Sequence, residues 1–399
     1  MVTYFIGTAY FFLIVEILII IKSFVYARQE RKANRPDFTP KAAIIAPHYG
    51  WDTQTAENAK RLLDQDYGGD YEVLFVTHQT GTSGYDLSYP HLLEIAEGRT
   101  NARVLLAPNI IDNSLPRSQK VENLMTAIAE LPDDVDVIAF VDADSTVQKD
   151  WLRLLIQPLQ DKNIGATVGA RFYVPQRLNF ASLVETIWIN FQIALQGGHS
   201  LTMVWGGSNA IRRSLLDVGS VLKRWENATI EDHNLTHTVR DLKLKVHFVP
   251  DCIAVTHTDN RTWRQILEFT NRQMVMTFRM GLKAQWILTL LVFLPKALIV
   301  FASIPLVFHY NRLILVFLVP FIEIQSYRLF SKNLPQWLKD DPQVHEKIRI
   351  SSFAAPTSMF LAGLNAVYAL FQNKIVWGGV RYEILSATKC RILGRIHTK

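Results

Sequence analysis

Long apolar segments at both ends of the chain, with a mixed polar region between them, most constrain what this sequence can fold into. Tyr4–Val25 is almost continuously apolar and is interrupted by Glu16 and Lys22. A helix needs roughly 20 such residues to cross the hydrocarbon core of a bilayer. Basic residues follow this segment rather than precede it, unlike in a secretory signal peptide. The pattern predicts a retained transmembrane anchor, residues 1–26, whose C-terminal end is cytoplasmic.

Three further apolar blocks lie late in the chain. They are Trp286–Phe308, Leu313–Phe330 and Phe353–Phe371. Lys296 and Glu323 interrupt the first two, and charges inside a span usually face a partner helix or a cavity. We expect residues 281–372 to form about three transmembrane or interfacial helices, followed by a basic tail, residues 373–399. The side of the membrane on which this tail lies stays open, because three crossings predict the outside and its basic residues favour the inside.

Residues 27–280 have the pattern of an α/β domain. Non-alternating apolar runs are typical of strands that are buried on both faces. Such runs occur in Lys41–Gly50, Tyr71–Gly81, Ala102–Pro108 and Asp136–Asp144. Helix-like segments, Gln54–Gln65 and Arg117–Leu131, separate some of them, so a largely parallel sheet is expected. No GxGxxG or GxxxxGK[ST] motif is present, which excludes the Rossmann and P-loop fingerprints.

Asp142 and Asp144 follow the run that ends at Val141. Parallel sheets bind ligands beyond the carboxyl ends of their strands, and these two acids fall at such an end. Two carboxylates one residue apart in an extended segment point to the same side. They suit Mg²⁺ or Mn²⁺, which keep water ligands and take further oxygens from a substrate diphosphate. The alternative is helix capping, because Asp144 and Ser145 are also good N-cap residues.

Further polar clusters are candidate site elements. Glu231 and Asp232 precede a helical pattern, where a carboxylate can act as a general base or simply favour the helix N-terminus. Gly206 and Gly207 allow close backbone approach to a ligand, or form an ordinary loop. Arg272 lies in an amphipathic stretch, where it can bind a diphosphate or extend to the membrane interface.

Leu178–Gly198 is an apolar, aromatic segment inside the polar region. It predicts either an interfacial helix, which would bring the site to lipid headgroups, or a core helix. The net charge of +6 is compatible with an anionic partner or a membrane surface. Because the basic residues cluster beside the apolar segments, we expect the lipid bilayer as a partner and no nucleic acid.

These motifs, in this order, resemble the family 2 and family 21 type inverting glycosyltransferases of the GT-A fold, particularly the ceramide glucosyltransferases. Lys120 and Asn123 match a Lys-x-x-Asn segment, and Asp142 with Asp144 match the DxD motif that binds metal and diphosphate. Gly206 and Gly207 match a glycine-containing acceptor-side loop. Glu231 and Asp232 match the ED motif, whose second acid is the catalytic base. Arg272 matches the start of the (Q/R)xxRW motif, and the resemblance covers residues 41–382.

The resemblance implies a GT-A nucleotide-sugar-binding domain with a mixed, mostly parallel sheet, one N-terminal and about three C-terminal transmembrane helices. It implies transfer of a hexose, with glucose expected, from a UDP-sugar to a membrane lipid acceptor such as ceramide. Asp142 and Asp144 would hold Mg²⁺ or Mn²⁺, and Asp232 would be the base. Donor-binding roles are implied for Lys120, Asn123, Asp142, Gly206, Gly207, Glu231 and Arg272. The expected location is a bacterial inner membrane or an endomembrane, with the catalytic domain in the cytoplasm.

Two features depart from the family pattern. The acid expected after the second strand is replaced by His78 and Gln79, with Asp86 further on. Val275 and Met276 replace the Arg-Trp pair of (Q/R)xxRW. Three alternatives stay open. A processive polysaccharide synthase would share the motifs but require an intact QxxRW and more spans, and a polyprenyl-phosphate sugar transferase would differ mainly in its acceptor. The missing acid favours the third, a non-enzymatic receptor with a degenerate transferase domain.

Overall fold

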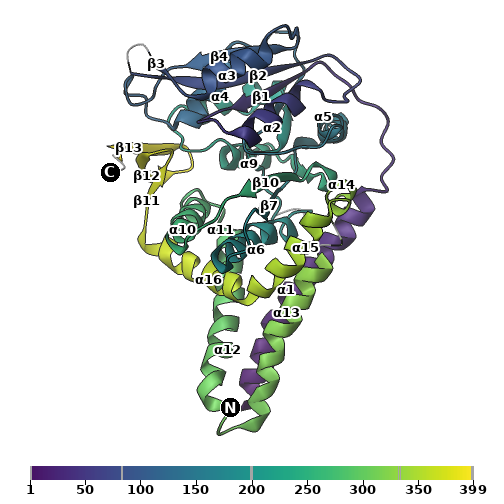
Figure 1. Cartoon of the computed structure of the whole chain (residues 1–399), viewed down its shortest axis with the longest axis vertical. Coiled ribbons are helices and arrows are strands. Elements are labelled where there is room, and N and C mark those ends of the chain that lie inside the picture. Colours follow the sequence, from purple (N-terminus) through teal and green to yellow (C-terminus); the bar gives the residue numbers. More distant parts are fainter. Residues whose placement is uncertain (1, 82–83, 198–200, 331, 333, 397–399) are drawn as a thin grey trace. The chain divides into compact units, whose positions relative to one another are not determined.

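The computed structural model describes residues 2–81, 84–197, 201–330, 332 and 334–396. The chain divides into two compact units, and each is assembled from segments that are distant in sequence (Figure 1). The first unit comprises Met1–Arg31, Phe172–Leu201 and His257–Asn373. The second comprises Lys32–Arg171, Thr202–Thr256 and Lys374–Lys399. This division differs from the continuous domain of residues 27–280 expected from the sequence, because two internal segments of that range pack with the helices of the first unit.

An eight-stranded mixed sheet forms the centre of the second unit, in the order β3-β2-β1-β5-β8-β6-β9, with β4 paired to β2. Its strands are β1 Ala42–Pro47, β2 Tyr71–Thr80, β3 Gly84–Tyr85, β4 Ala102–Ala107, β5 Val137–Phe140, β6 Ile164–Val168, β8 Asn209–Arg212 and β9 Lys245–Phe248. β1 is parallel to both β2 and β5, whereas β8 runs antiparallel to β5 and β6. The expected mixed, mostly parallel sheet is confirmed.

Both faces of this sheet are covered, as the non-alternating apolar runs predicted. Along β1, Ala42 and Ile44 enter one core and Ala43 and Ile45 enter the other. The helices of the unit are α2 Thr53–Leu63, α3 Ser88–Ala96, α4 Gln119–Ala129, α5 Trp151–Ile156, α7 Ser214–Val218, α8 Val221–Trp225 and α9 Asp232–Asp241. α2 and α5 supply the first core, and α4, α8 and α9 supply the second. The sheet is thus a rigid base for the residues that follow its strands.

Most of the expected basic tail, residues 373–399, forms three antiparallel strands. They are β11 Lys374–Trp377, β12 Val380–Ser386 and β13 Lys389–Arg395. Gly378 and Gly379 join β11 to β12 with φ of +56° and +71°. Positive φ at both central residues is the pattern of a type I′ hairpin turn, which glycine adopts at little cost. The small sheet belongs to the second unit.

The first unit is mostly helical and also contains most of β7, Arg171–Pro175. Its helices are α1 Val2–Glu30, α6 Phe180–Ala194, α10 Trp263–Arg279, α11 Lys283–Leu288, α12 Leu294–Leu306, α13 Leu318–Phe330, α14 Gln336–Lys339, α15 Pro342–Ser351 and α16 Ala355–Phe371. Among the described residues, Val2–Glu30, Lys283–Leu306 and Pro342–Phe371 are long and apolar enough to cross a membrane. One N-terminal and two late candidate spans are therefore present. The expected late block at Leu313–Phe330 begins as a 3₁₀ helix, Asn311–Phe317, and is not among these three.

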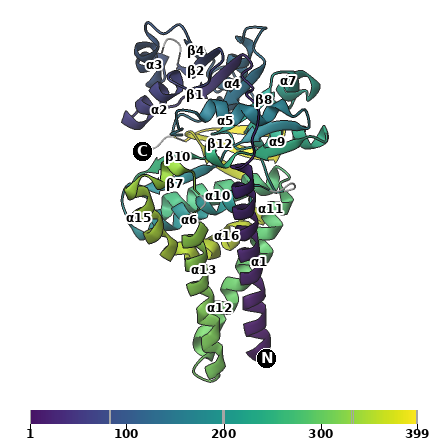
Figure 2. The same ribbon diagram turned by 90° about the vertical axis from the view of Figure 1, so that its right-hand side faces the viewer.

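α1, α12 and α13 lie side by side (Figures 1 and 2). The Lys296 ammonium contacts Glu16 of α1, and its Nζ lies 3.1 Å from Oε1 of Glu323 of α13. All three side chains are almost completely buried. The charges inside the apolar blocks therefore face partner helices, as expected for ionisable groups in such segments.

α6 lies within the segment Leu178–Gly198, of which Gly198 is outside the described residues. Every residue of α6 except Phe180 and Gln192 is buried. Trp188 Nε1 donates to Asn365 Oδ1 at 3.1 Å, and Ser358 Oγ donates to the Val184 carbonyl at 3.0 Å. α6 is thus a core helix of the first unit, the second of the two alternatives drawn from its sequence, because its apolar face packs against α16 rather than remaining open to lipid.

Candidate active site

Asp142 follows β5 at the carboxyl edge of the sheet and contacts two basic side chains. Its Oδ1 lies 2.6 Å from Lys120 Nζ, and its Oδ2 accepts a hydrogen bond from Arg171 Nη2 at 2.9 Å. The same guanidinium nitrogen lies 3.3 Å from Asp144 Oδ1. Arg171 therefore holds the two acids together. Its sequence context, the start of a strand, contains no signal that marks it as a site residue.

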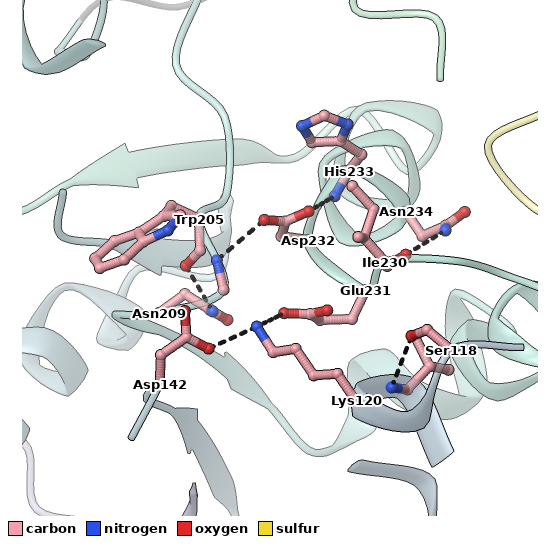
Figure 3. Close-up of polar contacts among 12 residues, drawn as sticks. Ser118, Lys120, Asp142, Trp205, Asn209, Ile230, Glu231, Asp232, His233 and Asn234 are labelled. Atoms are coloured by element: carbon pink, nitrogen blue, oxygen red, sulfur yellow. Dashed lines mark hydrogen bonds and ion pairs between the residues drawn. The ribbon is translucent and has the colours of Figure 1, made fainter. Parts of the chain in front are cut away.

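Lys120 connects the strand end to a third acid (Figure 3). It lies in the first turn of α4, whose N-cap Ser118 accepts a hydrogen bond from Val121 N at 3.2 Å. Nζ lies 2.6 Å from both Asp142 Oδ1 and Glu231 Oε1. Burial alone would lower the pKa of Lys120, but the charges of Asp142 and Glu231 outweigh it and raise that pKa above its ordinary value. Lys120 is consequently a fixed cation between two acids.

Asp232 lies beside this group at the N-terminus of α9 (Figure 3). Its Oδ2 accepts the Gly206 N–H at 3.2 Å, and its Oδ1 accepts the His233 N–H at 2.6 Å. Burial raises the pKa of Asp232 in spite of these donors and the nearby Lys120 charge. Burial, together with the charges of Asp232 and Asp142, also raises the pKa of Glu231 to about 7. A carboxylate with a raised pKa and a fixed orientation is suited to take up a proton.

Gly206 lies so close to the charged cluster that a side chain there would collide with it. A Cβ on Gly206 would lie 2.1 Å from Glu231 Oε1 and 2.6 Å from Lys120 Nζ. A Cβ on Gly207 would lie 2.0 Å from a carbon of the Trp205 ring. The guanidinium of Arg171 lies 4.9 Å from the centroid of that ring. The paired glycines therefore let the loop backbone pack directly against the side chains of the site.

The balance of acidic and basic side chains around Asp142 and Asp144 indicates whether a divalent cation can bind there. Four carboxyl groups (Asp142, Asp144, Glu231 and Asp232) face two cations (Lys120 and Arg171), so acids outnumber cations in the cluster. In the part of the chain that the structure describes, no group of three or more His, Cys, Asp or Glu side chains could hold a metal ion. Asp142 and Asp144 nonetheless offer hard oxygens, and the Asp144 side chain is 52% exposed. This set fits a cation such as Mg²⁺, which takes one or two carboxylates and completes its shell with water and phosphate oxygens.

A pocket of about 390 Å³ opens beside Lys120, and all its lining residues belong to the second unit. His48 and His78 line it where β1 and β2 end. His48 Nδ1 lies 2.8 Å from the Ala46 carbonyl, so Nδ1 carries the proton and Nε2 is an acceptor. Burial lowers the pKa of His48 to about 4. His48 therefore presents a neutral imidazole, and its Nε2 has no partner among the described residues.

Asp86 supplies a carboxylate near the end of β2, where the family pattern has an acid and this sequence has His78 and Gln79. The Asp86 backbone N–H donates to the His78 carbonyl at 3.0 Å, and this hydrogen bond holds Asp86 beside the end of β2. Asp86 Oδ1 accepts hydrogen bonds from Gly50 N at 2.9 Å and from Ser88 Oγ at 2.6 Å. Asp86 also lines the pocket. Tertiary structure thus places a carboxylate close to the position where the linear motif lacks one.

The other two predicted donor-binding residues differ in their surroundings. Asn123, on α4, lines the pocket, but its side-chain amide accepts from Gln119 Nε2 at 2.9 Å and donates to the Val76 carbonyl at 3.4 Å. Asn123 therefore also ties α4 to β2. Arg272 lies on α10 in the first unit, with its guanidinium 5.3 Å from the Phe269 ring centroid. The cluster around Lys120 is formed by residues of the second unit alone.

Residues 9–390 match the family model described as glycosyl transferase family 21. No curated protein sequence matches the chain significantly. One similar solved structure is the mannosyltransferase PcManGT from Pyrobaculum calidifontis in complex with GDP-Man and Mn²⁺, with 16% identity, 91% of this chain and 99% of that chain covered, and a TM-score of 0.48. Another is a mycobacterial protein, with 19% identity, 64% and 77% coverage, and a TM-score of 0.35.

Proposed function

Because this chain belongs to glycosyltransferase family 21, we propose that it transfers a hexose from a UDP-sugar to a membrane lipid, with inversion at the anomeric carbon. Glucose is the proposed hexose, and ceramide or a related lipid is the proposed acceptor. Family membership establishes the chain as a glycosyltransferase. The donor, the acceptor and the metal are the parts that belong to the proposal.

One observation carries the proposal: Lys120 joins the DxD acid Asp142 to Glu231, next to Asp232. These residues come from the end of β5, the first turn of α4 and the start of α9. Sugar transfer from a nucleotide requires a group that accepts the acceptor proton and groups that stabilise the leaving diphosphate. The cluster contains both kinds of group within a few ångströms.

Asp232 is the proposed base. Gly206 N–H and His233 N–H each bind one of its oxygens, so the carboxylate is held in one orientation while lone pairs remain for an acceptor hydroxyl. Asp232 takes the hydroxyl proton as the acceptor oxygen forms a bond to the anomeric carbon. The bond from that carbon to the diphosphate oxygen breaks on the opposite face, and its electron pair leaves with the nucleotide. The Lys120 ammonium stabilises the negative charge that develops there.

Asp142 and Asp144 would hold a divalent cation, Mg²⁺ or Mn²⁺. Such an ion neutralises charge on the leaving diphosphate. The excess of acids over cations in the cluster and the exposure of Asp144 support this assignment. Arg171 contacts both acids and is therefore expected to shift when a cation binds.

A lipid acceptor is supported by the three helices that are long and apolar enough to cross a membrane. Apolar side chains on the outer surface of α1, such as Phe11, Ile14 and Leu18, are more than half exposed, which is expected of groups that contact lipid. The proposed location is a multi-pass membrane protein with its catalytic unit in the cytoplasm. Basic residues just after α1, including Arg31 and Lys32, support this orientation.

The test is an incubation of membranes that contain the protein with radiolabelled UDP-glucose and a lipid extract, with Mn²⁺ or with EDTA. We expect label in a chloroform-soluble product, and loss of that label with EDTA and in the Asp232→Asn variant. Parallel reactions with other UDP- and GDP-sugars identify the donor. Label in an insoluble polymer would instead indicate a polysaccharide synthase. Product that appears only with added polyprenyl phosphate would indicate a polyprenyl-phosphate sugar transferase.

A further inference from the structure

The C-terminal sheet, β11–β13, forms part of the wall of the pocket beside Lys120. Trp377, the two glycines of the hairpin turn, Tyr382 and Arg395 all line this pocket. On the other side, the pocket is lined by His48, His78 and Asp86. A volume of about 390 Å³ lies within the range of ligand sites, roughly 300–1,000 Å³. β11–β13 therefore supply part of the lining of a cavity that the ends of β1 and β2 also line.

This sheet is attached to α9 and to the segments that precede α4 and α9. Asn234 Nδ2 in α9 donates to the Ala387 carbonyl at 2.8 Å. Cys390 N donates to the Asn227 carbonyl, also at 2.8 Å, and Cys390 Sγ lies 3.6 Å from the Pro116 carbonyl. The Tyr382 side chain is buried at 2% exposure. These contacts hold β11–β13 against the segments that lead into α4 and α9. They therefore fix the position of the residues of this sheet that line the pocket.

Two features of the pocket indicate a polar, anionic ligand. Buried His48 Nε2 is an acceptor without a partner in the described part of the chain, and a ligand N–H or hydroxyl would satisfy it. Arg395 is an exposed cation on the pocket wall, and no salt bridge to a carboxylate is found for it among the described residues. A guanidinium binds phosphate oxygens through two parallel hydrogen bonds. Lys120 also lines the pocket, with its ammonium paired to Asp142 and Glu231.

We propose that the C-terminal sheet is part of the nucleotide-binding site and that Arg395 binds the diphosphate of the donor. This inference rests on the proposed function, since it takes a nucleoside diphosphate as the ligand of the pocket. It assigns a binding role to a strand that is remote in sequence from the other site residues. Trp377 and the Gly378-Gly379 turn line the pocket beside the end of β13, which contains Arg395. A hydrogen bond from Ile396 N to the Gly379 carbonyl, at 2.8 Å, holds the end of β13 at this turn.

The experiment measures binding of UDP, GDP and uridine to the full-length protein in detergent by isothermal titration calorimetry. Arg395→Ala is expected to weaken UDP binding by about 10-fold or more, because a charge-assisted hydrogen bond is lost. Arg395→Lys should recover part of this loss. Uridine, which has no phosphate, should bind wild type and Arg395→Ala equally. Arg391→Ala is the matched control, since Arg391 lies on the same strand, is 66% exposed and pairs with Glu383 instead.

The outcomes separate this inference from the proposed function. Unchanged UDP affinity in Arg395→Ala, or an equal loss for uridine, would overturn the diphosphate contact. If GDP binds and UDP does not, the proposed donor is wrong, and the Arg395→Ala loss should then appear with GDP. If no nucleotide binds the wild-type protein, the pocket assignment fails. Thermal melting of each variant shows whether the fold is retained, and a failure of lipid glycosylation with intact nucleotide binding would count against the proposed reaction alone.

Discussion

The ammonium of Lys120 lies 2.6 Å from Glu231 Oε1, although three strands of the central sheet, β5, β6 and β8, separate α4 from the start of α9 in sequence. The Glu231 side chain is only 1% exposed, so its charge depends on this single cation. Removal of one partner from a buried ion pair typically costs about 3–5 kcal/mol, because the other charge is left unpaired.

Lys120→Met is therefore expected to lower the melting temperature and to reduce kcat/KM by at least about 100-fold. The double variant Lys120→Met/Glu231→Gln should regain stability, because no buried charge is left without a partner, but it should stay inactive. Thermal melting and the radiolabel assay measure the two effects. Equal stability of the single and double variants would show that the pair has no structural role.

Asp232→Asn should reduce turnover by about 10²- to 10⁴-fold while nucleotide binding stays near the wild-type value. The amide keeps the shape of the side chain but does not accept the acceptor proton. Initial rates and calorimetric UDP titration measure the two quantities. Asp241→Asn, at the exposed end of the same helix, is the control. A wild-type rate in Asp232→Asn would remove Asp232 from its role as base.

Gly206→Ala should impair activity through a purely steric effect. The new Cβ would lie 2.1 Å from Glu231 Oε1, so either the loop or the Lys120–Glu231 pair has to move. We expect kcat/KM to fall by about 10-fold or more, with a melting temperature lowered by the strain. Gly7→Ala is the control, because a Cβ at Gly7 meets no atom within 4 Å. If Gly206→Ala is as active as Gly7→Ala, the close packing has no functional consequence.

The buried triad of Glu16, Lys296 and Glu323 is expected to stabilise the helical unit. Lys296→Met leaves two buried carboxylates without their cation and should lower the melting temperature of the protein in detergent. The triple variant Glu16→Gln/Lys296→Met/Glu323→Gln should recover most of the loss. Lys22→Met changes an exposed lysine of the same helix α1 and serves as the control. Equal melting of Lys296→Met and Lys22→Met would contradict a stabilising triad.

Stability should fall as the pH drops below about 6.5, partly because of His48. Its pKa is about 4 in the folded protein against an ordinary value of 6.5, so between these values the unfolded chain binds a proton that the folded chain does not. The free energy of unfolding therefore rises with pH in this window, by up to about 1.4 kcal/mol per pH unit for one such histidine. His48→Gln should reduce the pH dependence of thermal melting. Part of the pH dependence should remain in this variant because of His233, since burial lowers the pKa of His233 to about 3.

Much of the fold could be predicted from local patterns. The apolar runs that became β1, β2, β4 and β5 do not alternate, and only a sheet covered on both faces can bury them. The position of Asp142 after a buried strand was also predictable, because ligand-binding residues follow the carboxyl ends of parallel strands. The apolar segments at both ends indicated helices able to cross a bilayer, since length and hydropathy decide that property.

Other features depended on contacts between distant segments. Nothing local marks Arg171 as the partner of two aspartates, or Asp86 as the acid that returns to the end of β2. α6 was ambiguous because an apolar helix can pack against protein or lie at a lipid surface with the same composition. The C-terminal residues resembled a basic tail, since short polar strands have weak sequence signals.

The sequence by itself therefore determined the strands β1, β2, β4 and β5, the long apolar helices and the acids that follow β5, because these depend on hydrophobic periodicity and chain direction. Tertiary structure alone decided which charges meet: Lys120 with Asp142 and Glu231, Lys296 with Glu16 and Glu323, and Arg395 with the pocket. Electrostatic interactions act over a few ångströms in space, and distance along the chain does not specify that separation.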